Sequence, residues 1–99
     1  MIRNRMRPIH PGEILREDVL DELGVSANAF AQAIGVPHNR ITAILNGQRG
    51  ISADTALRIA RYLGGDAKFW MNLQATYELR KAEVASGKEI ERQVRPRAA

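Results

Sequence analysis

The sequence predicts an all-α domain built from five helices. Apolar residues recur at the three- and four-residue spacing of a helix in every clear segment, and no useful stretch alternates as a strand does. Residues that favour helix starts precede these segments, and glycines that favour helix ends follow them. A chain of 99 residues has room for one such domain with a single core.

The first two helices are expected on either side of Gly24. The first begins at Pro11, a residue that suits the first helical position, and ends at Gly24. Its expected apolar face comprises Leu15, Val19, Leu20 and Leu23. The second follows Ser26, whose hydroxyl favours an N-cap, and ends at Gly35, which allows a sharp turn. The residues it is expected to bury are Phe30, Ala31 and Ile34.

The other three helices follow the same signals. The third is expected from Pro37 to the glycine at position 47, and its buried residues are Ile41, Ile44 and Leu45. The fourth is capped by Ser52 and ends at Gly64, and its apolar residues are Leu57, Ile59, Ala60 and Leu63. The fifth begins after Asp66 and is expected to end near Ala85.

The chain is expected to divide into three parts. Residues 1–8 form a basic N-terminal arm, and residues 9–86 form the helical domain. Residues 87–99 are polar and basic, so we expect a flexible tail there.

Composition argues against several classes of function. The chain has no cysteine, which excludes disulfides and cysteine-based metal sites, and His10 and His38 are its only histidines. Neither a glycine-rich phosphate loop nor a metal-spaced cluster is present, so we expect no catalytic residue, no metal and no cofactor. No apolar run approaches the roughly 18 residues of a membrane span, and the N-terminus lacks the apolar part of a signal peptide. We therefore expect a cytoplasmic location.

The placement of charge favours a nucleic-acid partner. The net charge is +4, and arginines gather at both ends, at positions 3, 5, 7, 92, 95 and 97. Acids gather in the first helix, as Glu13, Glu17, Asp18, Asp21 and Glu22. Between Glu22 and Asp54 there is no acid, and only Arg40 and Arg49 carry a full charge. Because a phosphate backbone repels carboxylates, an acid-free surface suits DNA.

The second and third helices, joined at Gly35, form a helix–turn–helix pattern, in which the second member enters the DNA major groove. If its apolar stripe faces the core, its remaining residues point outward or sideways: His38, Asn39, Arg40, Thr42 and Ala43. We expect His38 and Asn39 to read bases, since Asn pairs bidentately with adenine, and Arg40 and Arg49 to clamp phosphates. Ala43 suits a thymine methyl. The alternative is an ordinary glycine-linked helix pair with His38 merely solvated.

The stretch A-F-A-Q-A-I-G-V-P-H-N-R-I-T-A-I-L-N-G, followed by S-A-D-T-A-L-R-I-A-R-Y-L-G, resembles the helix–turn–helix of phage-repressor-type (XRE) regulators. Two flanks, I-H-P-G-E-I-L-R-E-D-V-L at residues 9–20 and G-D-A-K-F-W-M-N-L-Q-A-T-Y-E-L at residues 65–79, resemble the HigA (VapI-like) antitoxins. The resemblance covers residues 8 to about 83. It implies a five-helix lambda-repressor-like fold and a homodimer that binds operator DNA and represses its own operon. It also implies a partner toxin, HigB, a RelE-type ribonuclease that cuts mRNA.

The same resemblance implies which residues contact DNA. The family's contacting positions fall on His38, Asn39, Arg40 and Ala43. Phage repressors usually carry a phosphate-holding Gln at the start of the second helix, where this chain has Ala27 with Asn28 beside it. Asn28 is therefore the candidate in that helix.

The fifth helix carries two apolar stripes. One comprises Phe69, Trp70, Leu73 and Tyr77, and the other comprises Met71, Ala75, Leu79 and Ala82. Packing on one side of a bundle needs a single stripe, so the second predicts a homodimer interface. The alternative is that the small domain wraps this helix more deeply. We expect Trp70 in the core rather than at an interface.

The toxin-binding surface is left open by the sequence. The acidic outer face of the first helix, with the N-terminal arm, is one candidate, because RelE-type toxins are basic. The alternative is that these acids are only a solvated face. Two other functions stay open: a stand-alone regulator of the same fold without a toxin, and a helical protein-interaction module without DNA affinity.

Overall fold

The computed structural model describes residues 7–98, and every regular element in that range is a helix, as predicted. The elements are α1 (Pro11–Ile14), η2 (Leu15–Leu20), α2 (Asp21–Leu23), α3 (Ala27–Ile34), α4 (His38–Leu45), α5 (Ala53–Leu63) and α6 (Ala67–Gln93). Because α1, η2 and α2 follow without a break, they are the predicted first helix, and five helices make up the described chain. Most of the expected N-terminal arm, with Arg3 and Arg5, lies outside the described residues.

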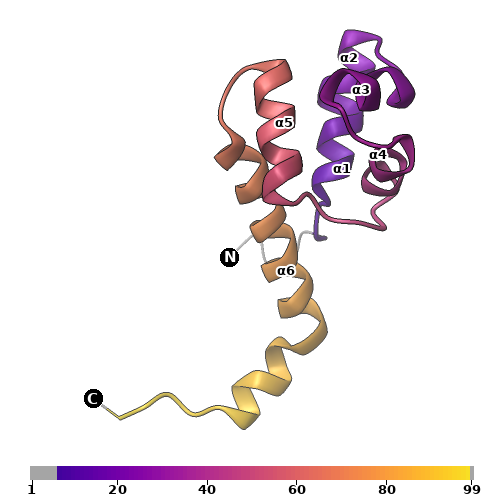
Figure 1. The fold of residues 1–99 in the computed structure, drawn as a ribbon. Helices are drawn as coiled ribbons and strands as arrows, with labels where there is room; N and C mark the ends of the chain where they lie inside the picture. Colours follow the sequence, from indigo (N-terminus) through magenta and orange to yellow (C-terminus); the bar gives the residue numbers. More distant parts are fainter. Residues whose placement is uncertain (1–6, 99) are drawn as a thin grey trace.

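The first helix packs against α4 and α6, α3 packs against α4 and α5, and α6 packs along α5 (Figure 1). The core takes at least one residue from each of these helices, and its largest fully buried apolar side chains are Leu15, Phe30, Ile41, Ile44 and Ile59. Trp70 is 5% exposed and belongs to the same core, as expected. Within residues 7–98, none of the helices has the length and apolar character that a membrane span needs.

One turn of the first helix departs from α-geometry. Residues Leu15–Leu20 form a π-helical turn, and the N–H of Asp21 donates to the carbonyl of Arg16, five residues back. Residues five apart point to different sides of an α-helix, whereas the wider π turn brings them closer to one side. Leu15 and Leu20 are accordingly both buried. This turn is not among the features predicted from the sequence.

Three residues assigned to apolar faces are exposed instead: Leu23, Leu57 and Phe69. Leu57 is two positions from the buried Ile59, and residues two apart do not share a helix face. Phe69 is exposed as well, although its ring meets that of the buried Trp70 edge-on, with centroids 5.1 Å apart. Leu23 is in the last helical position before Gly24 and lies outside the core cluster.

The expected end of the last helix near Ala85 is wrong, since α6 continues to Gln93. Gly87 inside it costs only about 1 kcal/mol relative to alanine, too little to stop a helix whose neighbours favour one. Side-chain contacts one turn apart also support the extension: Gln93 donates to Glu89 at 2.7 Å, and Arg92 pairs with Glu89. Figure 1 shows this half of α6 extending away from the bundle, and the described chain measures 52 × 24 × 23 Å.

A glycine sets the contact between α1 and α4. Gly12 is buried, and a Cβ added to it would lie 1.9 Å from the carbonyl oxygen of Ile44 and 2.7 Å from the carbonyl carbon. One turn further along, Arg16 donates to the carbonyl of Leu45 and to the side chain of Asn46, both at 3.3 Å. The backbone of α1 therefore rests directly on the C-terminal end of α4.

Candidate nucleic-acid interface

The turn between α3 and α4 has the geometry that the sequence predicts. Gly35 ends α3 with φ of 75°, a left-handed conformation that suits glycine. Its N–H donates to the carbonyl of Gln32 at 3.2 Å, and the N–H of Val36 donates to that of Ala31 at 3.0 Å. Val36 is buried beneath the turn. The two helices are thus held in a fixed relation by local bonds and by the core.

Among the described helices that start from a loop, only α4 begins without a side-chain cap. The others are capped by His10, Ser26, Ser52 and Asp66, each of which accepts a bond from a backbone N–H in the first turn. Pro37 is the N-cap of α4 rather than its first residue, so the helix starts at His38, one residue later than expected. The side chain of Pro37 offers no hydrogen-bond acceptor. Its first turn also contains no acid. Free N–H groups and the helix dipole make such an end attractive to a phosphate.

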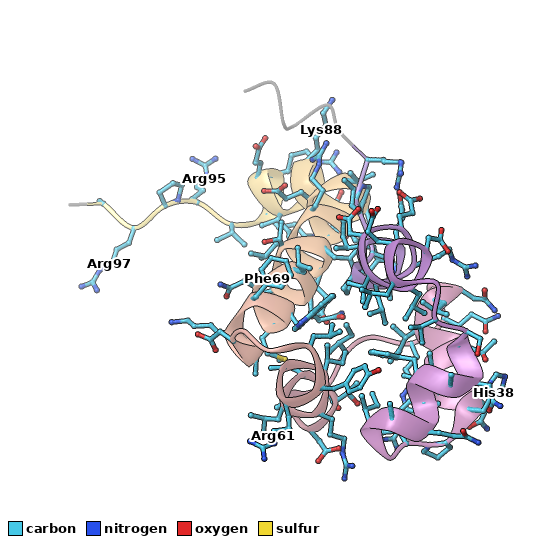
Figure 2. All side chains as sticks on the ribbon, turned by 90° about the horizontal axis from the view of Figure 1, so that it is seen from above. His38, Arg61, Phe69, Lys88, Arg95 and Arg97 are labelled. Carbon is cyan, nitrogen blue, oxygen red and sulfur yellow. The ribbon has the colours of Figure 1, made fainter. Side chains whose placement is uncertain are left out.

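The outer side of α4 carries most of the predicted contact residues. Asn39, Thr42 and Ala43 follow the i, i+3, i+4 spacing of one helix face, while Ile41 and Ile44 face the core. Asn39 is exposed, as is His38, which lies at the outer edge of the domain in Figure 2. The structure therefore brings these predicted residues onto one accessible surface.

His38 and Thr42 contact each other. The hydroxyl of Thr42 donates to the carbonyl of His38 at 3.1 Å and lies 3.2 Å from the ring Nε2. A hydroxyl has one proton, so it can donate in only one of these two contacts. Asn39 lies exposed on the same face, and its side-chain amide makes no hydrogen bond within residues 7–98.

Arg40 is half-buried, and its Nε is buried without a hydrogen-bond partner among residues 7–98. Because the Nε is buried, a phosphate would meet the guanidinium at its terminal nitrogens, and charge-assisted bonds to phosphate are strong ones. Arg49 lies in the loop after α4 and is exposed, and Asn28 is exposed in the first turn of α3. Arg95 and Arg97 lie on the opposite side of the molecule from His38 (Figure 2).

Two arginines that the sequence analysis missed hold the C-terminal ends of the helix–turn–helix. Arg58 on α5 donates to the carbonyls of Ile34 at 3.0 Å and Gly35 at 3.3 Å, and it pairs with Asp54. Arg16 likewise donates to the carbonyl of Leu45 and to the side chain of Asn46 at the end of α4. A cation at a helix C-terminus is favoured by the helix dipole. An arginine bonded to a carbonyl more than 20 residues away has no spacing that a sequence pattern reveals.

His10 joins three elements. Its Nδ1 accepts from the N–H of Gly12 at 2.9 Å, and its ring meets the Tyr77 ring edge-on with centroids 4.8 Å apart. Burial lowers the pKa of His10, against the hydrogen bond to the Arg49 backbone, which raises it. The neutral ring that Gly12 needs as an acceptor is therefore favoured at neutral pH. In the sequence, His10 is distinguished only as one of two histidines.

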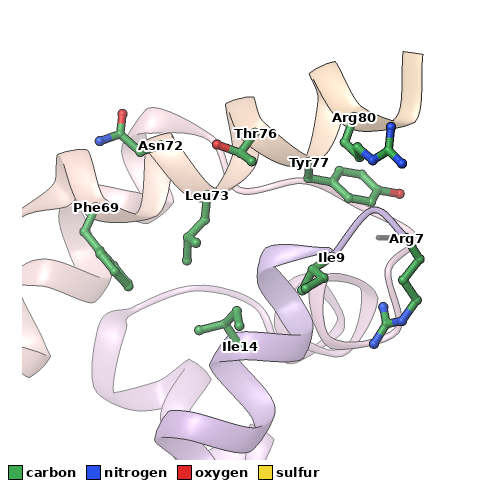
Figure 3. Close-up of a pocket in the computed structure, with 9 residues that line it drawn as sticks. All are labelled: Arg7, Ile9, Ile14, Phe69, Asn72, Leu73, Thr76, Tyr77 and Arg80. Atoms are coloured by element: carbon green, nitrogen blue, oxygen red, sulfur yellow. The ribbon is translucent and has the colours of Figure 1, made fainter. Parts of the chain in front are cut away.

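An apolar groove of about 390 Å³ lies between the N-terminal segment, the first helix and α6 (Figure 3). Ile9, Ile14 and Leu73 line its middle, with Phe69 at one end and Arg7 and Arg80 toward the other. Arg7 forms an ion pair with Glu13, and the hydrogen bond from Arg7 lowers the pKa of that carboxyl.

The second stripe of α6 borders this groove. Ala75, Leu79 and Ala82 are exposed, whereas Met71 is half-buried and packs against the core. Asn72 and Thr76 line the groove and precede Leu79 at i, i+4, i+7 spacing, so all three share one helix face. The groove and the stripe thus form one continuous surface.

The arrangement agrees with known proteins. The sequence profile of the helix-turn-helix family matches residues 15–70. Virulence-associated protein I of Dichelobacter nodosus is 56% identical over 81 residues, which is 82% of this chain and 75% of that protein. An addiction module antidote protein of the HigA family from Coxiella burnetii has a solved structure with a TM-score of 0.89 and 52% identity, covering 93% of this chain and all of that one.

A Pseudomonas aeruginosa protein solved in complex with its operator DNA is also similar. Its TM-score is 0.91 at 50% identity, and the match covers 95% of this chain and 99% of that one. These matches span both flanks of the helix–turn–helix as well as the motif itself. The chain belongs to the helix-turn-helix family and, within it, to the HigA-type (VapI-like) antitoxins.

Proposed function

We propose that this protein is the antitoxin of a type II toxin–antitoxin module, and that as a homodimer it binds operator DNA and represses its own operon. In the cytoplasm it also neutralises a RelE-type, mRNA-cleaving HigB toxin. The observation that carries the proposal is the surface of α4, which is exposed, free of acids and uncapped at its N-terminus. The Pseudomonas aeruginosa relative that is 50% identical in sequence and was solved in complex with its operator DNA supports it.

In this proposal α4 lies in the major groove and its residues divide between two tasks. Asn39 and His38 read base edges, Ala43 contacts a thymine methyl, and Thr42 supports His38. Phosphates bind at the N-terminus of α4 and at Arg40, Arg49 and Asn28.

Asn39→Ala is expected to weaken operator binding by ~1–3 kcal/mol and to leave binding to random duplex nearly unchanged. The reason is that a bidentate amide–adenine pair exists only on the correct sequence. Fluorescence anisotropy with both duplexes measures the difference.

Arg49→Ala is the control, because a phosphate contact carries no sequence information. It is expected to weaken binding to both duplexes alike. Equal losses on both duplexes for Asn39→Ala would show that the base-reading positions lie elsewhere, and no operator binding by the unmodified protein would refute the DNA-binding function itself.

The homodimer would form through the outer face of α6. Leu79, with small alanines at 75 and 82, offers a flat apolar seam that the core of the domain leaves exposed. The neighbouring groove residues Phe69, Asn72 and Thr76 extend this seam. A dimer places two copies of α4 on one face of DNA, about 34 Å apart.

The toxin would dock on the acidic face of the first helix. Glu17, Asp18, Asp21 and Glu22 are all exposed, and a ribonuclease that handles RNA is basic. The rival reading is a stand-alone regulator, in which these acids have no partner.

Reversing two of these charges, Glu17→Lys with Asp21→Lys, is expected to weaken toxin neutralisation at least about tenfold, since like charges across an interface repel. An mRNA-cleavage assay with the toxin encoded beside this gene gives the readout. Glu89→Lys with Glu91→Lys makes the same charge change on the far part of α6 and should leave neutralisation intact. If the variant with Glu17→Lys and Asp21→Lys neutralises the toxin as well as the parent does, the toxin binds another surface. If the unmodified protein does not neutralise the toxin at all, the stand-alone regulator is favoured.

A further inference from the structure

We propose that Lys81 on α6 and Arg49 in the loop after α4 together form a second phosphate site, which binds a DNA backbone phosphate beyond the end of α4. This inference rests on the proposed DNA-binding function. It extends the DNA-contacting surface from the helix–turn–helix to the last helix.

An open groove of about 460 Å³ separates the loop from α6. One wall is the loop itself, with Gly47, Gln48 and Arg49, and the other is α6, with Tyr77 and Lys81. The loop starts directly after Leu45, so the groove opens beside the C-terminal end of the proposed recognition helix.

The loop is fastened to α6 through a buried amide. The side chain of Gln74 accepts from the N–H of Ile51 at 2.8 Å and is itself buried. A Cβ added to Gly50 would lie 2.7 Å from the Gln74 side chain, so the loop backbone rests directly on that side chain. The packing of the loop backbone on Gln74 therefore fixes the position of the Arg49 backbone relative to α6.

Aromatic rings place Lys81 on the loop side of α6. The Lys81 ammonium lies 5.7 Å from the centre of the Tyr77 ring, and Tyr77 in turn contacts His10. His10 and Arg49 line the same groove, so the loop lies beside this stack of rings. After burial, the charge of Lys81 is a further cause that lowers the pKa of His10, as expected if the ammonium is close to the ring.

The charges in the groove favour an anion. Within residues 7–98, neither Lys81 nor Arg49 forms an ion pair. The one carboxylate that lines the groove, Glu78, accepts a bond from Gln74 at 2.7 Å. Two cations therefore face one carboxylate that is already engaged, beside a helix proposed to lie in the major groove. A phosphodiester of the flanking DNA backbone is the anion that this position would meet.

The test compares operator and random duplexes, titrated with the full-length protein over a range of salt concentrations. Lys81→Gln is expected to weaken both complexes by a similar factor and to lower the slope of log K against log salt by about 0.9 per bound subunit. Lys88→Gln is the matched control, since Lys88 lies seven residues further along the same side of α6 and outside the groove. It should leave the slope unchanged.

Two further variants sharpen the test. Glu78→Gln removes the carboxylate and should strengthen both complexes, opposite in sign to Lys81→Gln. The losses from Lys81→Gln and Arg49→Ala should be less than additive, because both residues hold one phosphate. Thermal melts check that each variant is folded.

The outcomes separate the inference from the function on which it rests. If the unmodified protein fails to bind its operator, the proposed function fails. If it binds and Lys81→Gln keeps the full salt slope, or Lys88→Gln loses as much, the second phosphate site is refuted. Loss of toxin binding without loss of DNA binding in Lys81→Gln would likewise overturn it and assign the groove to the toxin.

Discussion

Gly12→Ala is expected to destabilise the domain by about 3 kcal/mol or more, the upper end of what overpacking costs. The added Cβ meets the backbone of Ile44 at 1.9 Å, and a backbone cannot rotate away as a flexible side chain can. The first helix must then move off α4, which also loosens the bonds from Arg16 to the end of that helix. For a domain of this size the loss lowers Tm by about 12–24 °C. Thermal unfolding followed by circular dichroism measures it.

Gly87→Ala is the matched control. Gly87 lies inside α6, and a Cβ there would meet nothing within 4 Å. Alanine is the better helix former by up to about 1 kcal/mol, so this variant should be as stable as the parent or slightly more stable. An unchanged Tm for Gly12→Ala would mean that α1 and α4 tolerate separation, and the close contact would then have no energetic importance.

Leu79→Glu is expected to convert the proposed dimer into monomers and to weaken operator binding about 10²–10⁴-fold, because the second half-site is lost. Leu79 is 68% exposed at the centre of the apolar seam, and a buried carboxylate there would lack a partner. Analytical ultracentrifugation reports the mass, and anisotropy on the operator reports affinity. Helicity should hardly change.

Val84→Glu makes the same chemical change at a residue that is 63% exposed on the same helix. Its position is five residues along, on another side of α6, so both the dimer and operator binding should survive. A Leu79→Glu protein that still sediments as a dimer would move the interface to the first helix or the N-terminal segment. If toxin binds the first helix, neutralisation should survive Leu79→Glu.

Features specified by neighbouring residues were predictable from sequence. The Ser26 cap, the Gly35 turn and the burial of Phe30 each depend on a signal within a few positions, and each is confirmed. The surface of α4 was predictable for the same reason, because burial of Ile41 and Ile44 dictates which side faces outward.

Features that depend on distant partners were not predictable. The contact of Gly12 with Ile44 spans 32 positions, and an isolated glycine in a helix usually signals only flexibility. Arg58 could not be recognised as a cap for α3, since its acceptors are backbone carbonyls. The apolar spacing in α6 placed Phe69 in the core, but its side chain is exposed and contacts only the edge of the core at Trp70. The end of α6 was misplaced because a polar, basic composition indicates a flexible tail but does not exclude an exposed helix held by its own side-chain pairs.

The long α6 gives this small protein two levels of local stability. Its first half is held by the buried Trp70 and Gln74, whereas every residue from Ser86 to Ala98 is exposed except the half-buried Gly87. The outer turns therefore depend on their own hydrogen bonds and on side-chain pairs worth only a few tenths of a kcal/mol each. Such a segment opens without unfolding the rest, so backbone from Ser86 onward becomes accessible to a protease while the α4 surface stays intact. Proteolytic degradation of the antitoxin would then start at this end of the chain.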